Sequence, residues 1–290
     1  LDYGVLQITQ SDRAREAAAA RVLTSIRKNG VTLLSIGNGT ASYETEQFAA
    51  ALIQDNHLKD VHYLITNEAG ASVYSASKLA KEELPEYDVV IRGAVSIARR
   101  VQDPLAELVK IDPQAIGVGQ YQHDVNQKEL ASTLDATIES AVNHVGVDLN
   151  TASAALLRHI AGINATTAKN IIAYRNEHGV FTSRRELLKV PRLGPAAFTQ
   201  CAGFLRIPGG KDPIENTGVH PESYAAAKAL LARFNLSPAQ AAAGLLQKEA
   251  EAVGYPRLAQ ELDVGEPTLR DMVKELSKPG RDPRDELPPP

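Results

Sequence analysis

Nine lysine and arginine side chains crowd into a short central part of this sequence, and their chemistry suits the binding of phosphate groups. Residues 151–211 carry these nine bases against only two acids, Glu177 and Glu186, which gives the segment a formal charge of +7. The flanking segments are acidic, at −7 for residues 1–150 and −4 for residues 212–290. A basic segment in an acidic chain is typical of a site that holds a polyanion. A solvated basic face without a ligand is the alternative interpretation of the charge alone.

The basic segment contains an internal repeat. A shift of 30 residues places apolar positions on one another in the pairs Leu157/Leu187, Ile160/Val190, Ile163/Leu193 and Ala168/Phe198. Each copy predicts two helices joined by a tight turn, with the second helix starting at Ala165 in the first copy and at Pro195 in the second. The unpaired amides at the start of a helix carry the positive end of its dipole, so they bind phosphate without reading a base.

This repeat resembles the helix-hairpin-helix family in its tandem form, from residue 147 through residue 204. The family's hairpin reads Gly–apolar–Gly, but here Asn164 replaces the second glycine of the first copy and Arg192 the first glycine of the second. Because Asn tolerates a positive φ, we expect the first turn to be intact. We expect the bulk of Arg192 to disturb the amides of the second turn, although its guanidinium can itself pair with a phosphate. The predicted nucleic-acid-binding residues are Gly162, Ile163, Asn164, Ala165, Lys169, Lys189, Arg192, Leu193, Gly194 and Pro195. A duplicated helical spacer is the alternative.

The first 110 residues alternate strand patterns with helical ones. Strands are expected at 1–9, 31–36 and 61–66, and helices from Ser11 or Asp12 to Gly30, up to about Asn56, and at about 71–83. This alternation favours an α/β layer with parallel strands, in which polar loops at 37–40 and 67–70 lie at the carboxyl ends of the strands. A further helix from Val89 is expected to place one apolar face inward, formed by Val89, Ala94, Ile97, Ala98 and Val101.

Five blocks of sequence, in order, are similar to the bacterial Tex family of transcription accessory proteins. They cover residues 37–42, 67–77, 92–100, 103–110 and 117–125. The resemblance implies an α/β ribonuclease-H-like (YqgF-type) domain followed by all-α helix-hairpin-helix and small helical domains. The implied domains are 1–110, 147–210 and 211–278, with a connecting loop and long helix at 111–146 and a linker at 279–290. The resemblance also implies an N-terminal helical region and a C-terminal S1 RNA-binding domain, so we expect a fragment of a longer protein.

Glu68 and Asp103 are the candidates for catalysis that this resemblance implies. The ribonuclease-H-like fold hydrolyses phosphodiesters with carboxylates that hold two Mg²⁺ ions. Each residue also has a structural explanation, Glu68 as an acid before a helix at Ala71 and Asp103 as the N-cap before Pro104. We expect the first strand of that fold, which normally carries the leading aspartate, to be absent from this sequence, and we therefore predict no catalysis and no metal. No cofactor is predicted either.

The sequence therefore predicts a non-catalytic, largely sequence-independent nucleic-acid-binding scaffold that acts in transcription. Its expected partners are RNA or DNA, bound through backbone phosphates, and RNA polymerase or an associated transcription factor. A single cysteine, no secretory signal and no apolar run of spanning length favour the cytoplasm and argue against a membrane partner. Two alternatives stay open, a metal-dependent nuclease or resolvase and a protein-interaction module that docks on the transcription machinery. The sequence does not separate DNA from RNA as the ligand.

Overall fold

The computed structural model describes residues 2–277, which divide into two compact units. The first unit ends at Ala131 and the second begins at Ser132, within the helix α8 (Gln127–Val145). The linker predicted at 279–290 lies outside the described residues, and the finer domain boundaries remain predictions. No helix within residues 2–277 is both long enough and apolar enough to cross a membrane.

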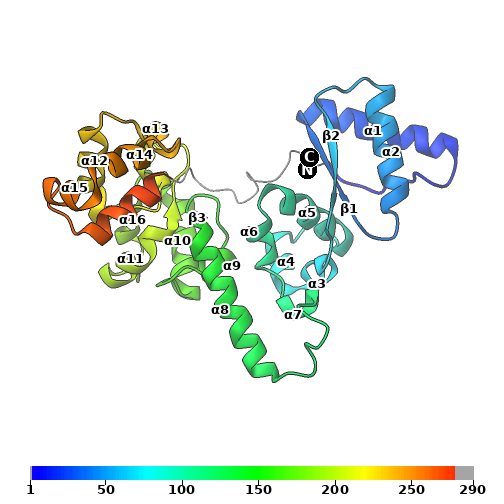
Figure 1. Ribbon diagram of the computed structural model, residues 1–290. Helices are drawn as coiled ribbons and strands as arrows, with labels where there is room; N and C mark the ends of the chain where they lie inside the picture. Colours follow the sequence, from blue (N-terminus) through cyan, green and yellow to red (C-terminus); the bar gives the residue numbers. More distant parts are fainter. Residues whose placement is uncertain (1, 278–290) are drawn as a thin grey trace. The chain divides into compact units, whose positions relative to one another are not determined.

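The first unit is built on a two-stranded parallel sheet. Its elements are α1 (Asp12–Asn29), β1 (Leu33–Gly37), α2 (Ser42–Asp55), β2 (His62–Thr66), α3 (Ala71–Ala76), α4 (Lys78–Glu83), α5 (Val89–Gln102), α6 (Pro104–Leu108), α7 (Pro113–Ile116) and the start of α8 (Gln127–Val145). Strands β1 and β2 pair with Leu33 opposite His62, and α2 and α5 lie on opposite sides of them (Figure 1). The α/β layer with parallel strands is thereby confirmed.

Local capping signals explain where the helices of this unit begin and end. The Ser11 hydroxyl accepts a hydrogen bond from the Ala14 amide at 3.2 Å, and Gly30 ends α1 with a φ of 62° in the left-handed region. The helix predicted over 71–83 is instead two helices, because Ser77 is extended and caps α4. A Ser with an extended backbone stops one helix and starts the next.

Residues 2–8 form no strand, so the strand predicted at 1–9 is wrong. The carbonyl of Tyr3 accepts a hydrogen bond from Arg21 at 2.6 Å, and Asp2 pairs with Lys28 at 3.1 Å, which ties the segment to α1. Val5 is 78% exposed. Neither β1 nor β2 pairs with this segment, so its alternating apolar side chains have no sheet on which to pack.

The buried face of α5 is polar rather than apolar, which corrects the face predicted for this helix. Arg92, Ser96 and Arg100 are buried at intervals of four residues, whereas Val89 is 49% exposed and Ala94 and Ala98 are also exposed. Each buried residue has a hydrogen-bond acceptor, such as the Leu84 carbonyl 3.0 Å from Arg92 Nε. Protein acceptors replace water at Arg92 Nε, Ser96 Oγ and Arg100 Nη1, whereas Nε and Nη2 of Arg100 are buried without an acceptor among residues 2–277.

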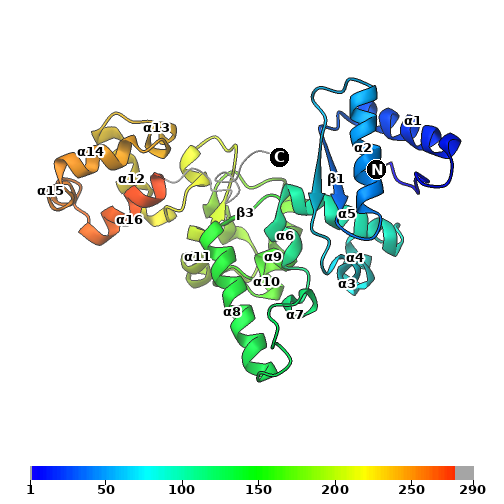
Figure 2. The ribbon, with the colours of Figure 1, turned by 45° about the vertical axis from the view of Figure 1, so that its right-hand side comes forward.

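The second unit contains the repeat and a group of helices that follows it. The repeat comprises the end of α8, β3 (Val147–Asp148), α9 (Ala154–Leu157), α10 (Ala165–His178), the 3₁₀ helix η1 (Arg184–Lys189), α11 (Pro195–Cys201), η2 (Ala202–Phe204) and β4 (Leu205–Arg206). The following elements are η3 (Pro213–Asn216), η4 (Pro221–Ser223), α12 (Tyr224–Arg233), α13 (Pro238–Ala242), α14 (Leu245–Val253), α15 (Tyr255–Glu261) and α16 (Glu266–Leu276). Helices α12 to α16 gather around one apolar core (Figure 2).

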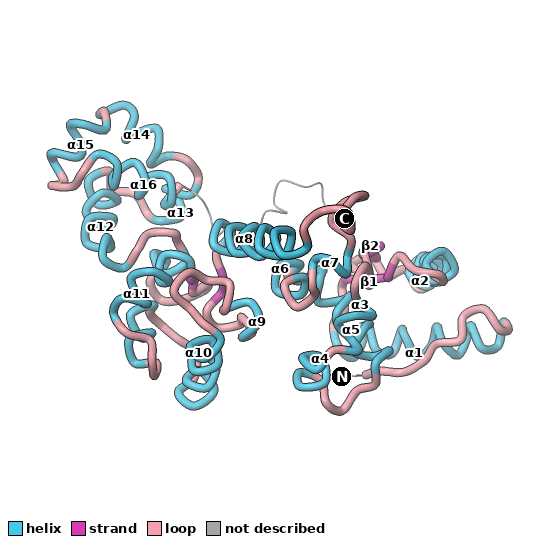
Figure 3. The backbone as a smooth tube through the Cα atoms, turned by 90° about the horizontal axis from the view of Figure 1, so that it is seen from below, coloured by secondary structure: helices cyan, strands magenta, loops and turns pink. Residues whose placement is uncertain are grey.

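The duplication predicted from the sequence is present in the structure. The second helices α10 and α11 begin at Ala165 and Pro195, as predicted. All four apolar pairs related by the shift of 30 are buried, with exposed fractions between 0% and 7%. A short parallel pairing of β3 with β4, drawn in magenta in Figure 3, joins the two ends of the repeat. The sequence pattern did not predict these strands.

One buried guanidinium ties the second copy to the segment after the repeat. Arg184 is 0% exposed, and its Nε lies 3.1 Å from a carboxylate oxygen of Glu215. Its Nη atoms donate to the backbone carbonyls of Ala202, Leu205, Ile214, Thr217 and Val219. A shift of 30 places Ala154 at the equivalent position of the first copy. Only the second copy therefore has this anchor.

Candidate nucleic-acid interface

The first hairpin requires glycine at Gly162. The amide of Ile163 donates to the Ile160 carbonyl at 3.0 Å, which closes the turn, and Gly162 has a φ of +81°. A Cβ at Gly162 would lie 2.7 Å from the Cβ of Gln200 and 3.0 Å from the Ala197 carbonyl oxygen. Glycine is needed both for the left-handed conformation and for the close approach of α11.

Asn164 does not adopt a positive φ, which corrects the reason given for the intact first turn. Its φ is −96°, and its Oδ1 caps α10 by accepting from the amides of Thr166 at 3.0 Å and Thr167 at 2.9 Å. Two of the amides expected to face a phosphate are therefore occupied by this side chain. The amides of Asn164 and Ala165 form no hydrogen bond within residues 2–277.

The second hairpin keeps the same turn with an arginine in the glycine conformation. The Leu193 amide donates to the Val190 carbonyl at 3.1 Å, and Arg192 has a φ of 65°. Pro191 precedes it, and the fixed φ of proline suits the second position of such a turn. The bulk of Arg192 therefore leaves the turn intact.

Helix α11 starts without a side-chain cap, because Gly194 takes the position that Asn164 holds at α10. No side chain accepts from its first amides, so those of Gly194, Ala196 and Ala197 remain open within residues 2–277, while Pro195 has no amide hydrogen. The second turn thus presents more open amides than the first, which reverses the difference expected from the residue types.

The three cations singled out in the sequence lie on the surface of the repeat. Lys169, Lys189 and Arg192 are all exposed. None of them forms an ion pair with another residue in the described part of the chain. Their charges are available to an anion from solvent.

Glu68 and Asp103 take different positions in the first unit. The Glu68 amide donates to Asn38 Oδ1 at 3.0 Å, and its carboxylate lies against the turn of Gly37 and Gly39. Asp103 caps α6 by accepting from the Ala106 amide at 3.0 Å, which confirms its structural explanation. Among residues 2–277, no three His, Cys, Asp or Glu side chains gather as a metal ion would require.

Arg100 supports the loop that carries Glu68. Its Nη1 donates to the carbonyls of Asn67 at 2.8 Å and Ala69 at 2.9 Å. Burial lowers the pKa of this guanidinium, and the nearby charge of Glu107 opposes the shift. Arg100 thus acts on the loop through backbone carbonyls, and the apolar pattern of α5 gave no signal of this role.

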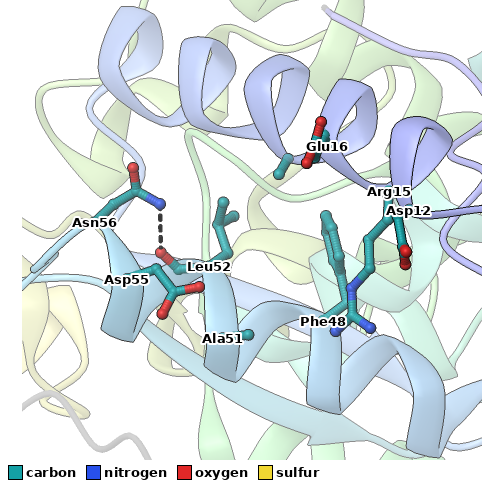
Figure 4. A pocket seen from close by; sticks show the side chains of 9 residues that line it. Asp12, Arg15, Glu16, Phe48, Ala51, Leu52, Asp55 and Asn56 are labelled. Atoms are coloured by element: carbon teal, nitrogen blue, oxygen red, sulfur yellow. Dashed lines mark hydrogen bonds between the residues drawn. The ribbon is translucent and has the colours of Figure 1, made fainter.

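A surface pocket of the first unit has the wrong charge for a phosphate. Figure 4 shows it between α1 and α2, with Asp12, Arg15 and Glu16 from one helix and Phe48 and Asp55 from the other. Three carboxylates against one guanidinium disfavour an anion. The basic repeat is therefore the better candidate interface.

The chain matches three models of known protein families. Residues 1–102 match the Tex protein YqgF-like domain, residues 142–206 the helix-hairpin-helix motif, and residues 212–284 an HHH domain. The predicted fold class, a YqgF-type α/β domain followed by helix-hairpin-helix and further helical domains, is confirmed.

The third match identifies as a helix-hairpin-helix domain a region that the sequence predicted only as small and helical. The matched region contains two turns at Asn235 and Asp263, which have φ values of 52° and 54°. Each is followed by an apolar residue and then by a helix N-cap, Ser237 or Gly265. These turns resemble those at Gly162 and Arg192 in conformation, but a shift of 30 residues does not relate them to either, so the internal repeat of the sequence gave no signal of them.

Similar proteins come from bacteria and from humans. The transcriptional accessory protein Tex of Neisseria gonorrhoeae is 55% identical over 89% of this chain and 34% of its own length. Protein tex of Bordetella pertussis is 52% identical over 95% of this chain and 34% of its own length. The human S1 RNA-binding domain-containing protein 1 is 55% identical over 65% of this chain and 19% of its own length.

The chain spans about a third of the length of these bacterial relatives, 34% in both cases. It covers the YqgF-like domain and the helices that follow, in the order that the family models describe. The chain therefore carries a Tex protein YqgF-like domain followed by two helix-hairpin-helix domains, and it is more than 50% identical to proteins named Tex over about nine tenths of its length.

Proposed function

We propose that this chain is a non-catalytic nucleic-acid-binding scaffold that acts in transcription and holds RNA or DNA by the backbone phosphates. The observation that carries the proposal is the tandem repeat, in which Lys169, Lys189 and Arg192 are exposed, unpaired within residues 2–277 and close to two tight turns. The helix-hairpin-helix match over residues 142–206 supports the same role.

Binding should be largely independent of base sequence. Amides and cations address phosphate oxygens, which are the same in every nucleotide. We also propose that the protein partner is RNA polymerase or an associated transcription factor and that the compartment is the cytoplasm. Both proposals are supported by a relative that is named a transcriptional accessory protein.

The proposal includes the absence of catalysis. Asp103 caps α6, and among residues 2–277 no three His, Cys, Asp or Glu side chains gather where a metal ion could bind, which supports this part of the proposal. Incubation of the chain with structured DNA and RNA in Mg²⁺ or Mn²⁺ should give no cleavage. Cleavage that disappears in Glu68→Gln would contradict this part of the proposal.

Charge reversal in the repeat tests phosphate binding directly. Lys169→Glu, and separately Lys189→Glu with Arg192→Glu, should weaken binding to labelled single- and double-stranded DNA and RNA at two salt concentrations. Each lost phosphate contact should lower the slope of log affinity against log salt by about 0.7 to 0.9. The matched control is Lys59→Glu, an exposed lysine of the first unit.

The double variant should lose more affinity than the single one, because it removes two charges. Circular dichroism verifies that the variants remain folded. If both variants are folded and bind DNA and RNA like the parent, the repeat is a spacer and the proposed function of this region is wrong.

A further inference from the structure

A pocket of about 510 Å³ opens beside the second hairpin. One wall is a single face of α10, formed by Asn170, Ala173, Tyr174 and His178, and the other is formed by Lys189 and Pro191. Asn170 Nδ2 donates to the Pro191 carbonyl at 2.8 Å, which joins the two walls. This volume falls in the range of small-molecule sites.

An aromatic stack leads from the core of the repeat into this pocket. The rings of Tyr174 and His178 lie 4.2 Å apart and 11° from parallel, and Tyr174 also stacks on Phe181 at 5.3 Å. Phe181 is 1% exposed, whereas half of the His178 side chain is exposed. The buried ring fixes the stack, and the outer ring offers an aromatic surface to a ligand.

The charges around the pocket suit one nucleotide of a strand. Lys189 lines the pocket, and Arg192 follows Pro191 directly in the turn. Glu177 is the acid of this pocket, and its carboxylate can accept a hydrogen bond from the amino or imino group of a base. Lys189 and Arg192 favour a phosphate at the rim of the pocket, whereas the negative charge of Glu177 disfavours a phosphate inside it.

We propose that this pocket takes one unstacked base of a single-stranded nucleic acid, while the adjoining phosphate contacts Lys189 and Arg192. The inference rests on the proposed function and adds to it a preference for single strands. Every base has a π face that stacks on an aromatic ring, so the pocket needs no particular sequence. Paired bases of a duplex are held inside its stack and do not reach the pocket.

Two variants separate the pocket from the phosphate contacts. His178→Ala removes the outer ring, and Ala173→Leu fills the pocket from an exposed position of α10. Each should lower affinity for a fluorescein-labelled 12-nucleotide single strand roughly 10-fold, with less than about a 2-fold change for a duplex of the same length. Asn176→Ala and Ala136→Leu are the matched controls, at exposed positions that do not line this pocket.

Photo-crosslinking gives a readout that does not depend on folding of a variant. A strand that carries 5-iodouracil should attach to the parent protein at Tyr174 or His178, as mapped by mass spectrometry. Attachment only elsewhere overturns the inference.

The outcomes separate this inference from the proposed function. If His178→Ala and Ala173→Leu bind single strands like the parent while the Lys189→Glu, Arg192→Glu variant binds both forms less well, the pocket inference is wrong and the proposed function stands. If the parent binds neither single strands nor duplex, both are wrong.

Discussion

The two copies of the helix-hairpin-helix repeat share their buried positions and differ at their turns. Leu157 and Leu187 are both fully buried, and Ser153 and Ser183 cap equivalent helices. At the left-handed position the first copy has Gly162 and the second has Arg192. A close-packed core tolerates few changes of volume, and the close approach of α11 likewise restricts the first turn to glycine, whereas the second turn accommodates an exposed arginine at the required φ.

The copies also differ in how they are attached to the rest of the second unit. Arg184 of the second copy is buried against Glu215 and five backbone carbonyls, while Ala154 of the first copy has no such group. The second copy therefore combines the structural anchor with the more open turn. Two copies of one motif can therefore keep the same buried positions while only one of them carries the buried arginine and the more open turn.

Removal of Arg184 should have the largest effect on stability. Arg184→Ala leaves Glu215, which is 4% exposed, buried without its cation, so the free energy of unfolding should fall by about 3 to 5 kcal/mol. Urea unfolding followed by circular dichroism measures the change. Arg158→Ala, an exposed arginine of the first copy, should change it by less than about 0.5 kcal/mol. Equal losses would show that the two copies are anchored alike.

Replacement of the turn glycine in the first copy should have the next largest effect. Gly162→Ala forces a left-handed conformation at a cost of about 1 to 2 kcal/mol, and its Cβ also crowds the Ala197 carbonyl. We expect a total loss of about 2 to 3 kcal/mol in thermal or urea unfolding. Gly194→Ala is the control, because Gly194 has a φ of −80° and open space around it. A small effect at Gly162 would contradict the close approach of α11.

Arg192→Gly should separate stability from binding in the second copy. Relief of the left-handed conformation gains about 1 to 2 kcal/mol. The larger backbone entropy of glycine in the unfolded chain offsets about 0.5 to 1 kcal/mol. The net change should be a stabilisation of about 0.5 kcal/mol, together with a salt slope of nucleic-acid binding lowered by about 0.7 to 0.9. Unchanged affinity and slope would show that Arg192 contacts no phosphate.

Asn164→Gly should have the smallest effect and make the first turn more like the second. The loss of the cap on Thr166 and Thr167 should cost a few tenths of a kcal/mol, whereas Asn164→Ala should cost about 1 kcal/mol. Because Asn164→Gly opens two amides, nucleic-acid affinity should stay equal or rise in a fluorescence titration. A clear loss of affinity in a folded Asn164→Gly variant would mean that the carboxamide itself contacts the ligand.

Local patterns in the sequence predicted much of the repeat and part of the first unit. The apolar pairs and turn residues located the starts of α10 and α11, since these signals act over a few residues. The same patterns were insufficient at Asn164, because a short polar side chain can either adopt a positive φ or cap a helix. The tertiary approach of α11 to Gly162, together with the turn closed there, places the left-handed residue at Gly162 and leaves Asn164 as the cap.

The sequence by itself determined the charge of the repeat, its duplication and the residues that turn the chain, because these depend on composition and near neighbours. Only the tertiary structure decided that residues 2–8 form no strand, that α5 buries Arg100, that Arg184 is an anchor, and that Tyr174, His178 and Lys189 line one pocket. Each of these depends on a partner distant in the sequence. A buried guanidinium that is satisfied by distant backbone carbonyls leaves no periodic pattern in the neighbouring residues. Nor does the local pattern of a segment show whether a neighbouring strand is available to pair with it.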